Sequence, residues 1–263
     1  MTPPLAWPLL ALLGLLIGSF LNVVVHRLPR GESIAFPGSH CPHCGHSLGA
    51  LDNIPLLSWI ILGGRCRYCR AGISWRYPLV EGSAAFLAVL ALANVGWQWR
   101  LLPALLFLWA LLSLTFIDLE TFLLPDWITK PGMVLGLLLN ATSWWTPAFA
   151  FCTPLDALLG LVLGYGLLRG FAELYRWLKG QEGMGHGDFK LLGMIGAWLG
   201  WQDMLLAIFL AALSGGLIAT LILLAGKGRN TEIPFGPYLA LGGALMLLWP
   251  RPITTFFFHL GVA

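Results

Sequence analysis

The sequence predicts an all-α polytopic membrane protein with about eight transmembrane helices and one short polar insert. Three observations lead to this prediction. Of the 263 residues, 58% are hydrophobic and only 10% are charged, too few to cover a soluble domain of this size. Apolar segments of roughly 20 residues recur, the length that crosses a hydrocarbon core of about 30 Å. Finally, Lys and Arg gather in alternate loops, as expected for a membrane protein.

The predicted spans follow one another along almost the whole chain. We expect them near residues 5–25, 78–97, 101–118, 127–145, 154–173, 189–201, 203–225 and 237–259. The sixth is short, so seven spans are an alternative to eight. The chain then divides into a first transmembrane helix (1–25), a cytoplasmic insert (26–77) and a transmembrane domain (78–263).

The first span differs from a secretory signal peptide. Its apolar run is long, and its first basic residues, Arg27 and Arg30, follow the run instead of preceding it. We therefore expect it to stay in the protein with its N-terminus outside. In that orientation 13 of the 15 Lys and Arg residues lie on the cytoplasmic side, and only Arg100 and Arg251 do not. The net charge of +3 is thus no sign of nucleic acid binding.

The insert contains two cysteine pairs with metal-ligand spacing. CPHC (41–44) and CRYC (66–69) place Cys41, Cys44, Cys66 and Cys69 on two tight turns. Two such turns complete a tetrahedral zinc site. Two disulfides are the alternative, but they rarely persist in the cytosol. We therefore predict a cytoplasmic zinc-binding domain whose closed four-thiolate site is structural rather than catalytic.

Two acidic stretches face the same side of the membrane in this topology. FIDLETFLLPD (116–126) places Asp118 at the inner end of the third span, and GMGHGDFKLL (183–192) places Asp188 at the start of the sixth. An ionisable group in a span indicates function and calls for a partner. Two carboxylates brought close share a proton, so one can act as base and the other as acid. Asp126, after Pro125, is interpreted as a helix N-cap.

These stretches, taken together, resemble the type IV prepilin peptidases, which are membrane aspartic proteases with a G-x-G-D signature. The resemblance covers nearly the whole chain. It includes the two acidic stretches and the cysteine pairs, together with GSFLNVVVHRLP (18–29), SWRYPLVEG (74–82) and IPFGPYLALGG (233–243). Any one segment is weak evidence, but their order along the chain makes the set specific.

The resemblance implies an activity. Members of the family cleave the basic leader from type IV prepilins or type II secretion pseudopilins at the cytoplasmic face of the bacterial inner membrane. They then methylate the new N-terminus with S-adenosylmethionine. The family's catalytic acids fall on Asp118 and Asp188, and its zinc ligands fall on the four cysteines. Residues 78–263 would then be the transmembrane peptidase domain, with prepilin and the lipid bilayer as partners.

The position of the methyl-donor site is less defined by the sequence. Gly64, Arg65 and Glu81 lie beside the cysteine pairs, and we predict that they shape it. Asn22 and His26 are expected to hydrogen-bond a neighbouring helix. An ion-coupled transporter, a pilus-assembly scaffold and a peptidase without methylation activity are the alternative functions.

Overall fold

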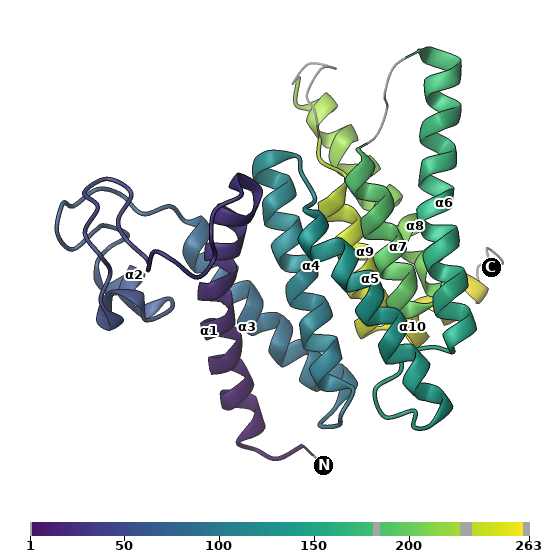
Figure 1. The fold of residues 1–263 in the computed structure, drawn as a ribbon, viewed down its shortest axis with the longest axis horizontal. Coiled ribbons are helices and arrows are strands. Elements are labelled where there is room, and N and C mark those ends of the chain that lie inside the picture. Colours follow the sequence, from purple (N-terminus) through teal and green to yellow (C-terminus); the bar gives the residue numbers. More distant parts are fainter. Residues whose placement is uncertain (1, 181–184, 227–232, 260–263) are drawn as a thin grey trace. The chain divides into compact units, whose positions relative to one another are not determined.

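The computed structural model describes residues 2–180, 185–226 and 233–259 and forms two compact units, residues 1–97 and 98–263 (Figure 1). Within the described ranges every long element is an α-helix, and two isolated β-bridges occur in the insert. The all-α prediction is therefore confirmed. The division into parts 1–25, 26–77 and 78–263 stays a prediction.

The first unit is a pair of helices with the insert between them in sequence. Helix α1 (Ala6–Arg27) packs against α3 (Arg76–Val95), and the insert carries the short helix α2 (Leu57–Ile61). Single 3-10 turns lie at Leu28–Arg30 and Ala50–Asn53. A Cβ added to Gly14 of α1 would lie 2.5 Å from the Cα of Ala85 in α3. Glycine on α1 thus permits the close approach of the two helices.

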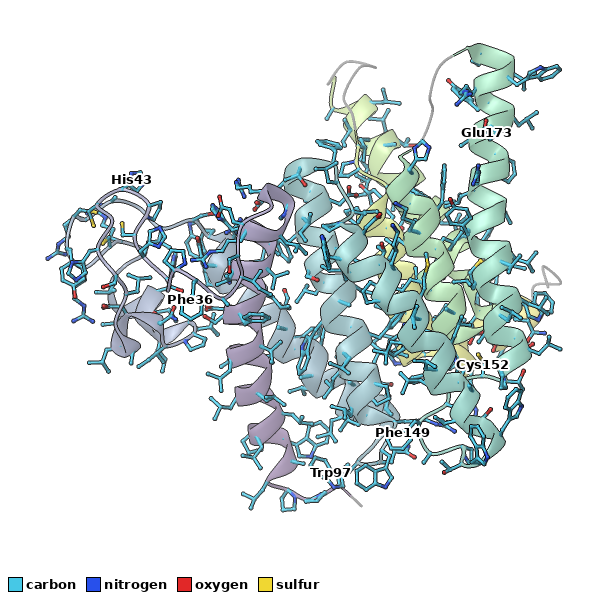
Figure 2. All side chains as sticks on the ribbon, viewed as in Figure 1. Phe36, His43, Trp97, Phe149, Cys152 and Glu173 are labelled. Atoms are coloured by element: carbon cyan, nitrogen blue, oxygen red, sulfur yellow. The ribbon has the colours of Figure 1, made fainter. Side chains whose placement is uncertain are left out.

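The second unit is a bundle of seven helices in the described part of the chain (Figure 1). In order they are α4 (Leu101–Thr121), α5 (Asp126–Ala141), α6 (Pro154–Lys179), α7 (His186–Leu199), α8 (Trp201–Leu224), α9 (Gly236–Leu248) and α10 (Pro250–His259), with a 3-10 turn at Thr142–Trp144. In Figure 2, Cys152 and Phe149 lie near one end of the bundle and Glu173 lies near the other end of α6.

In the part of the chain that the structure describes, five helices, α1, α3, α4, α6 and α8, are long and apolar enough to cross a membrane. This makes the chain a membrane protein, while the count of eight spans stays a prediction. The predicted segment 237–259 is two helices, because Pro250 has no N–H to continue α9 past Trp249.

Helix α7 is short because protein surrounds it. It packs against α5, α6, α8 and α9, and 11 of its 14 residues are buried. A helix shielded from lipid does not need the full length of a span. The packing against α6 is so close that a Cβ on Gly164 of α6 would lie 2.7 Å from the carbonyl oxygen of Leu192, and Gly160 and Gly196 touch through their backbones.

One buried amide holds the far end of α7. The Nδ2 group of Asn140, at the end of α5, donates to the carbonyl oxygens of Ala197 and Trp198 at 2.9 and 3.0 Å. Its Oδ1 accepts from the backbone N–H groups of Phe151 and Cys152. Asn140 therefore satisfies the last carbonyls of α7 and fixes the loop that leads to α6.

Candidate active site and metal centre

Asp118 lies in the last turn of α4 and is 5% exposed. Its Oδ2 accepts a hydrogen bond of 3.0 Å from the backbone N–H of Gly236, the first residue of α9. A Cβ on Gly236 would lie 2.5 Å from that oxygen. Only glycine therefore lets the start of α9 approach the carboxylate this closely.

Asp188 lies in the first turn of α7 and is 8% exposed. Its N–H donates to the carbonyl oxygen of Gly185, which precedes the helix, and its carboxylate folds back over the same glycine. The helix begins at His186 because Gly185 adopts an extended conformation. Gly183 of the G-x-G run lies outside the described residues.

Leu124 lies between the helix ends that place Asp118 and Asp188. A Cβ on Gly187, next to Asp188, would lie 2.7 Å from the Cβ of Leu124. A Cβ on Gly236, which binds Asp118, would lie 3.3 Å from the Cδ1 of the same leucine. The ends of α4, α7 and α9 thus meet around one side chain, and the charge of Asp118 acts on Asp188. The structure brings together two acids that are 70 residues apart in the chain.

The N-cap interpretation of Asp126 is wrong. Pro125 occupies the cap position of α5, and Asp126 is the first helical residue. Its carboxylate forms ion pairs with Lys130, at 2.7 Å, and with Lys190 of α7. Hydrogen bonds from Lys130 and Lys190 keep the pKa of Asp126 below its usual value. Ion pairs with Lys130, one turn further along α5, and with Lys190 of α7 explain this acid better than capping.

The four cysteines of the insert form a single cluster. The sulfur atoms of Cys41, Cys44, Cys66 and Cys69 all lie within 4.8 Å of one another. The Sγ atoms of Cys41 and Cys69 are 3.7 Å apart, and a tetrahedral zinc with Zn–S bonds of about 2.3 Å needs sulfurs about 3.8 Å apart. The cluster can therefore hold a zinc ion with little rearrangement, and all four cysteines are free thiols.

The two cysteine turns have the same backbone pattern. Four residues after the first cysteine of each pair, Gly45 and Arg70 have positive φ angles and donate their N–H groups back to the carbonyls of Cys41 and Cys66. Backbone N–H groups of Cys44 and His43 also lower the pKa of Cys41 to about 6. The first turn thus favours the thiolate of Cys41 that zinc needs, whereas burial and the neighbouring thiols raise the pKa of Cys69 to about 11.

Of the three residues predicted for the methyl donor, Glu81 alone is among those that line the described cavity of the first unit. Glu81 is 7% exposed and lines a cavity in the first unit. Arg65 is exposed, and neither it nor Gly64 lines that cavity. Gly64 instead supports the cavity wall, since a Cβ there would lie 2.8 Å from the ring of Trp59.

The thiol of Cys152 is separate from both sites. Burial, with the charges of Asp156 and Asp203, raises its pKa to about 12. A thiol that stays protonated is a poor nucleophile and metal ligand.

Sequence comparisons identify the family of the chain. The family model for the bacterial peptidase A24 N-terminal domain matches residues 12–95, and the model of the type IV leader peptidase family matches residues 105–220. The chain belongs to the type IV leader peptidase family. The resemblance to the prepilin peptidases is thereby confirmed. The range matched by the N-terminal model includes all four cysteines of the cluster, and the range matched by the peptidase model includes Asp118 and Asp188.

Curated relatives match the chain over nearly its whole length. A prepilin leader peptidase/N-methyltransferase of Aeromonas hydrophila is 44% identical over 97% of this chain and 94% of its own. Proteins with the same description from Stutzerimonas stutzeri and Pseudomonas aeruginosa are each 42% identical over 95% of this chain and 93% of theirs. No solved structure matches the chain.

Two contributors to the acid site were not assigned from the sequence. Gly236 and Leu124 lie in the quoted segments IPFGPYLALGG and FIDLETFLLPD, but neither bears a reactive group. A signal was present for Gly236, because Pro237 follows it and proline is common at the first position of a helix.

Proposed function

We propose that this protein removes basic leader peptides from prepilins or pseudopilins and then methylates the new N-terminus with S-adenosylmethionine. The cleavage reaction is assigned to Asp118 and Asp188. The observation that carries this assignment is the meeting, around Leu124, of the helix ends that carry the two buried acids, with Gly236 bound to Asp118. The curated relatives carry names for the same pair of activities.

The hydrogen bond from Gly236 gives the two acids different roles. It stabilises the ionised form of Asp118, because an N–H donor favours a carboxylate. Asp118 would take a proton from the attacking water, while protonated Asp188 would give its proton to the carbonyl oxygen of the scissile bond. When the tetrahedral intermediate breaks down, Asp118 would protonate the departing amine and Asp188 would recover its proton. The net reaction is hydrolysis of one peptide bond.

The cysteine cluster would hold the insert together. Fifty residues bury little core, and a structural metal often substitutes for it. Zinc bound by Cys41, Cys44, Cys66 and Cys69 would have no open coordination position, so we assign it no step of the reaction. Gly64, Arg65 and Glu81 are retained as the proposed surroundings of the methyl donor.

We also propose a location in the bacterial inner membrane, with the N-terminus periplasmic and the insert cytoplasmic. The distribution of Lys and Arg supports this orientation. Both lysines that pair with Asp126 lie on the proposed cytoplasmic side. Lys190 follows Asp188 by two residues, and Lys130 follows Asp126 by four. Reagents that label cysteine only from the periplasm should label a single cysteine placed near residue 2 and not one placed in the insert.

Purified protein and a prepilin substrate test the proposal. Mass spectrometry should show loss of the leader and addition of one methyl group. Asp118→Asn and Asp188→Asn should each slow cleavage by about 10³-fold or more, since each removes a group that transfers a proton. Asp203→Asn, which changes a half-buried acid of α8 in the same unit, is the matched control. Cleavage at the wild-type rate by either site variant would refute the aspartyl mechanism.

Ion-coupled transport is not favoured. Both family models and the curated relatives describe peptidases.

A further inference from the structure

The first unit contains a cavity of about 580 Å³ between its two long helices and the insert. Among the residues that line it are Asn22 of α1, Trp59 of α2, and Tyr77 and Glu81 of α3. Its volume is that of a pocket that encloses a whole small molecule. It is separate from the acid pair, since no residue of the second unit lines it.

Asn22 leaves an unused acceptor in this cavity. Its Nδ2 group donates to the carbonyl oxygens of Gly18 and Tyr77, at 3.3 and 3.2 Å. The amide orientation is therefore fixed, because the opposite one would place an oxygen against two carbonyl oxygens. The Oδ1 atom has no hydrogen-bond partner among the described residues, although Asn22 is only 3% exposed. Such a buried acceptor calls for a donor from outside the chain.

Glu81 supplies a negative charge in the same cavity. Its Oε2 accepts from the backbone N–H of Leu56 at 2.8 Å, and its carboxylate is also hydrogen-bonded to Ser19. A carboxylate has about four acceptor positions, so these two bonds leave further capacity. A buried carboxylate and an unpartnered amide oxygen, on two residues that line one cavity, are suited to a ligand that carries several N–H donors and a positive charge.

The cavity also presents a positive charge. The guanidinium group of Arg76, a lining residue, lies over the ring of Tyr77 at 4.9 Å from its centroid. A wall with both signs of charge is suited to an amino acid, which has an ammonium and a carboxylate group. The rings of Tyr77 and Trp59 add flat apolar surface for the rest of a nucleoside-sized molecule.

We propose that the Oδ1 of Asn22 and the carboxylate of Glu81 bind the α-ammonium group of S-adenosylmethionine. This assignment rests on the proposed function and adds Asn22 to it as a binding residue. A cleaved substrate also carries an ammonium group, at its new N-terminus, but it has no carboxylate beside that group. The mixed charge of the cavity therefore favours the methyl donor.

Direct binding of labelled S-adenosylmethionine to the full-length protein in detergent tests the assignment. Asn22→Leu and Glu81→Gln should each weaken binding about tenfold or more, because each removes a hydrogen bond to a charged group. Glu81→Gln retains an oxygen for the N–H of Leu56, so its fold should persist. Asn94→Leu on the exposed side of α3 and Glu173→Gln on α6 are matched controls and should bind the donor as the wild type does.

A second ligand separates loss of the ammonium contact from general damage to the cavity. 5′-Methylthioadenosine keeps the nucleoside but lacks the amino-acid part. Its affinity should be the same in the wild type, Asn22→Leu and Glu81→Gln. Equal weakening of both ligands in the two variants would overturn the proposal. So would unchanged donor affinity combined with a raised KM for the cleaved peptide, which would assign the site to the substrate's N-terminus.

The wild-type protein distinguishes a failure of this inference from a failure of the proposed function. If it cleaves and methylates while both variants bind the donor normally, the binding assignment is wrong and the function stands. If the wild type neither binds the donor nor methylates, the methyltransferase function and the binding assignment are both wrong.

Discussion

The two units of the protein build their sites in opposite ways. In residues 1–97 the proposed metal ligands come from two short turns, and each turn is complete within six residues of sequence. In residues 98–263 the acid pair depends on the ends of three helices, and the N–H that binds Asp118 comes from a residue 118 positions later. The cysteine site therefore depends on the folding of its own two turns, whereas the acid site depends on helix packing across the whole bundle.

The largest expected effect comes from removing the metal site. Cys41→Ser should abolish stoichiometric zinc binding and unfold the insert, since structural zinc contributes on the order of 10 kcal/mol to a small domain. Methyl transfer should be lost, while cleavage should persist because neither Asp118 nor Asp188 belongs to that unit. Metal analysis, protease sensitivity of the insert and the two activities check this.

Cys152→Ser is the matched control, because that cysteine lies outside the cluster. Equal loss of cleavage and methylation in Cys41→Ser would show that the two units do not function separately.

Gly236→Ala should break the assembled site without touching either acid. The added methyl group would lie 2.5 Å from the Oδ2 of Asp118, so α9 or the carboxylate must shift. We expect cleavage to fall about 10²-fold, as for loss of one precisely placed group. Gly166→Ala is the control, because a Cβ there meets nothing within 4 Å. Full activity of Gly236→Ala would mean that the contact at Asp118 is not needed.

The smallest effect is expected at the ion pairs of Asp126. Asp126→Asn should lower the stability of the second unit by less than about 1 kcal/mol at neutral pH, because the carboxylate is 42% exposed. The pairs lower its pKa, so their contribution is present above the unfolded pKa and is lost as the pH falls through the folded one.

Thermal unfolding of the wild type and Asp126→Asn across the acid range would measure this. A difference that grows toward low pH would contradict the ion-pair interpretation.

The sequence predicted most of the fold and the residue types of both sites. Each predicted span overlaps a helix in the described chain, because long apolar runs leave the backbone few alternatives in lipid, but the segment 237–259 is two helices instead of one. The clustering of the four cysteines could be predicted from their spacing alone. Asn22 was expected to bond a neighbouring helix, and its donation to Tyr77 confirms this.

The features that the sequence did not predict depend on contacts between segments that are distant in the chain. Gly236 matters through the atom it approaches, and Asp126 is held by Lys190 of another helix. That the amide oxygen of Asn22 has no partner among the described residues could be recognised only once both of its N–H groups were seen to be occupied. Sequence periodicity contains none of these pairings.

The hydrogen bonds of Asn140 hold one end of α7, and Asp188 lies at the other end of the same helix. The 14 residues of α7 extend about 21 Å. The close backbone contact with α6 opposes tilting or sliding of α7. One neutral amide at one end of the bundle thereby helps to position an acid at the opposite end of α7, and a change made far from any reacting atom can shift that acid.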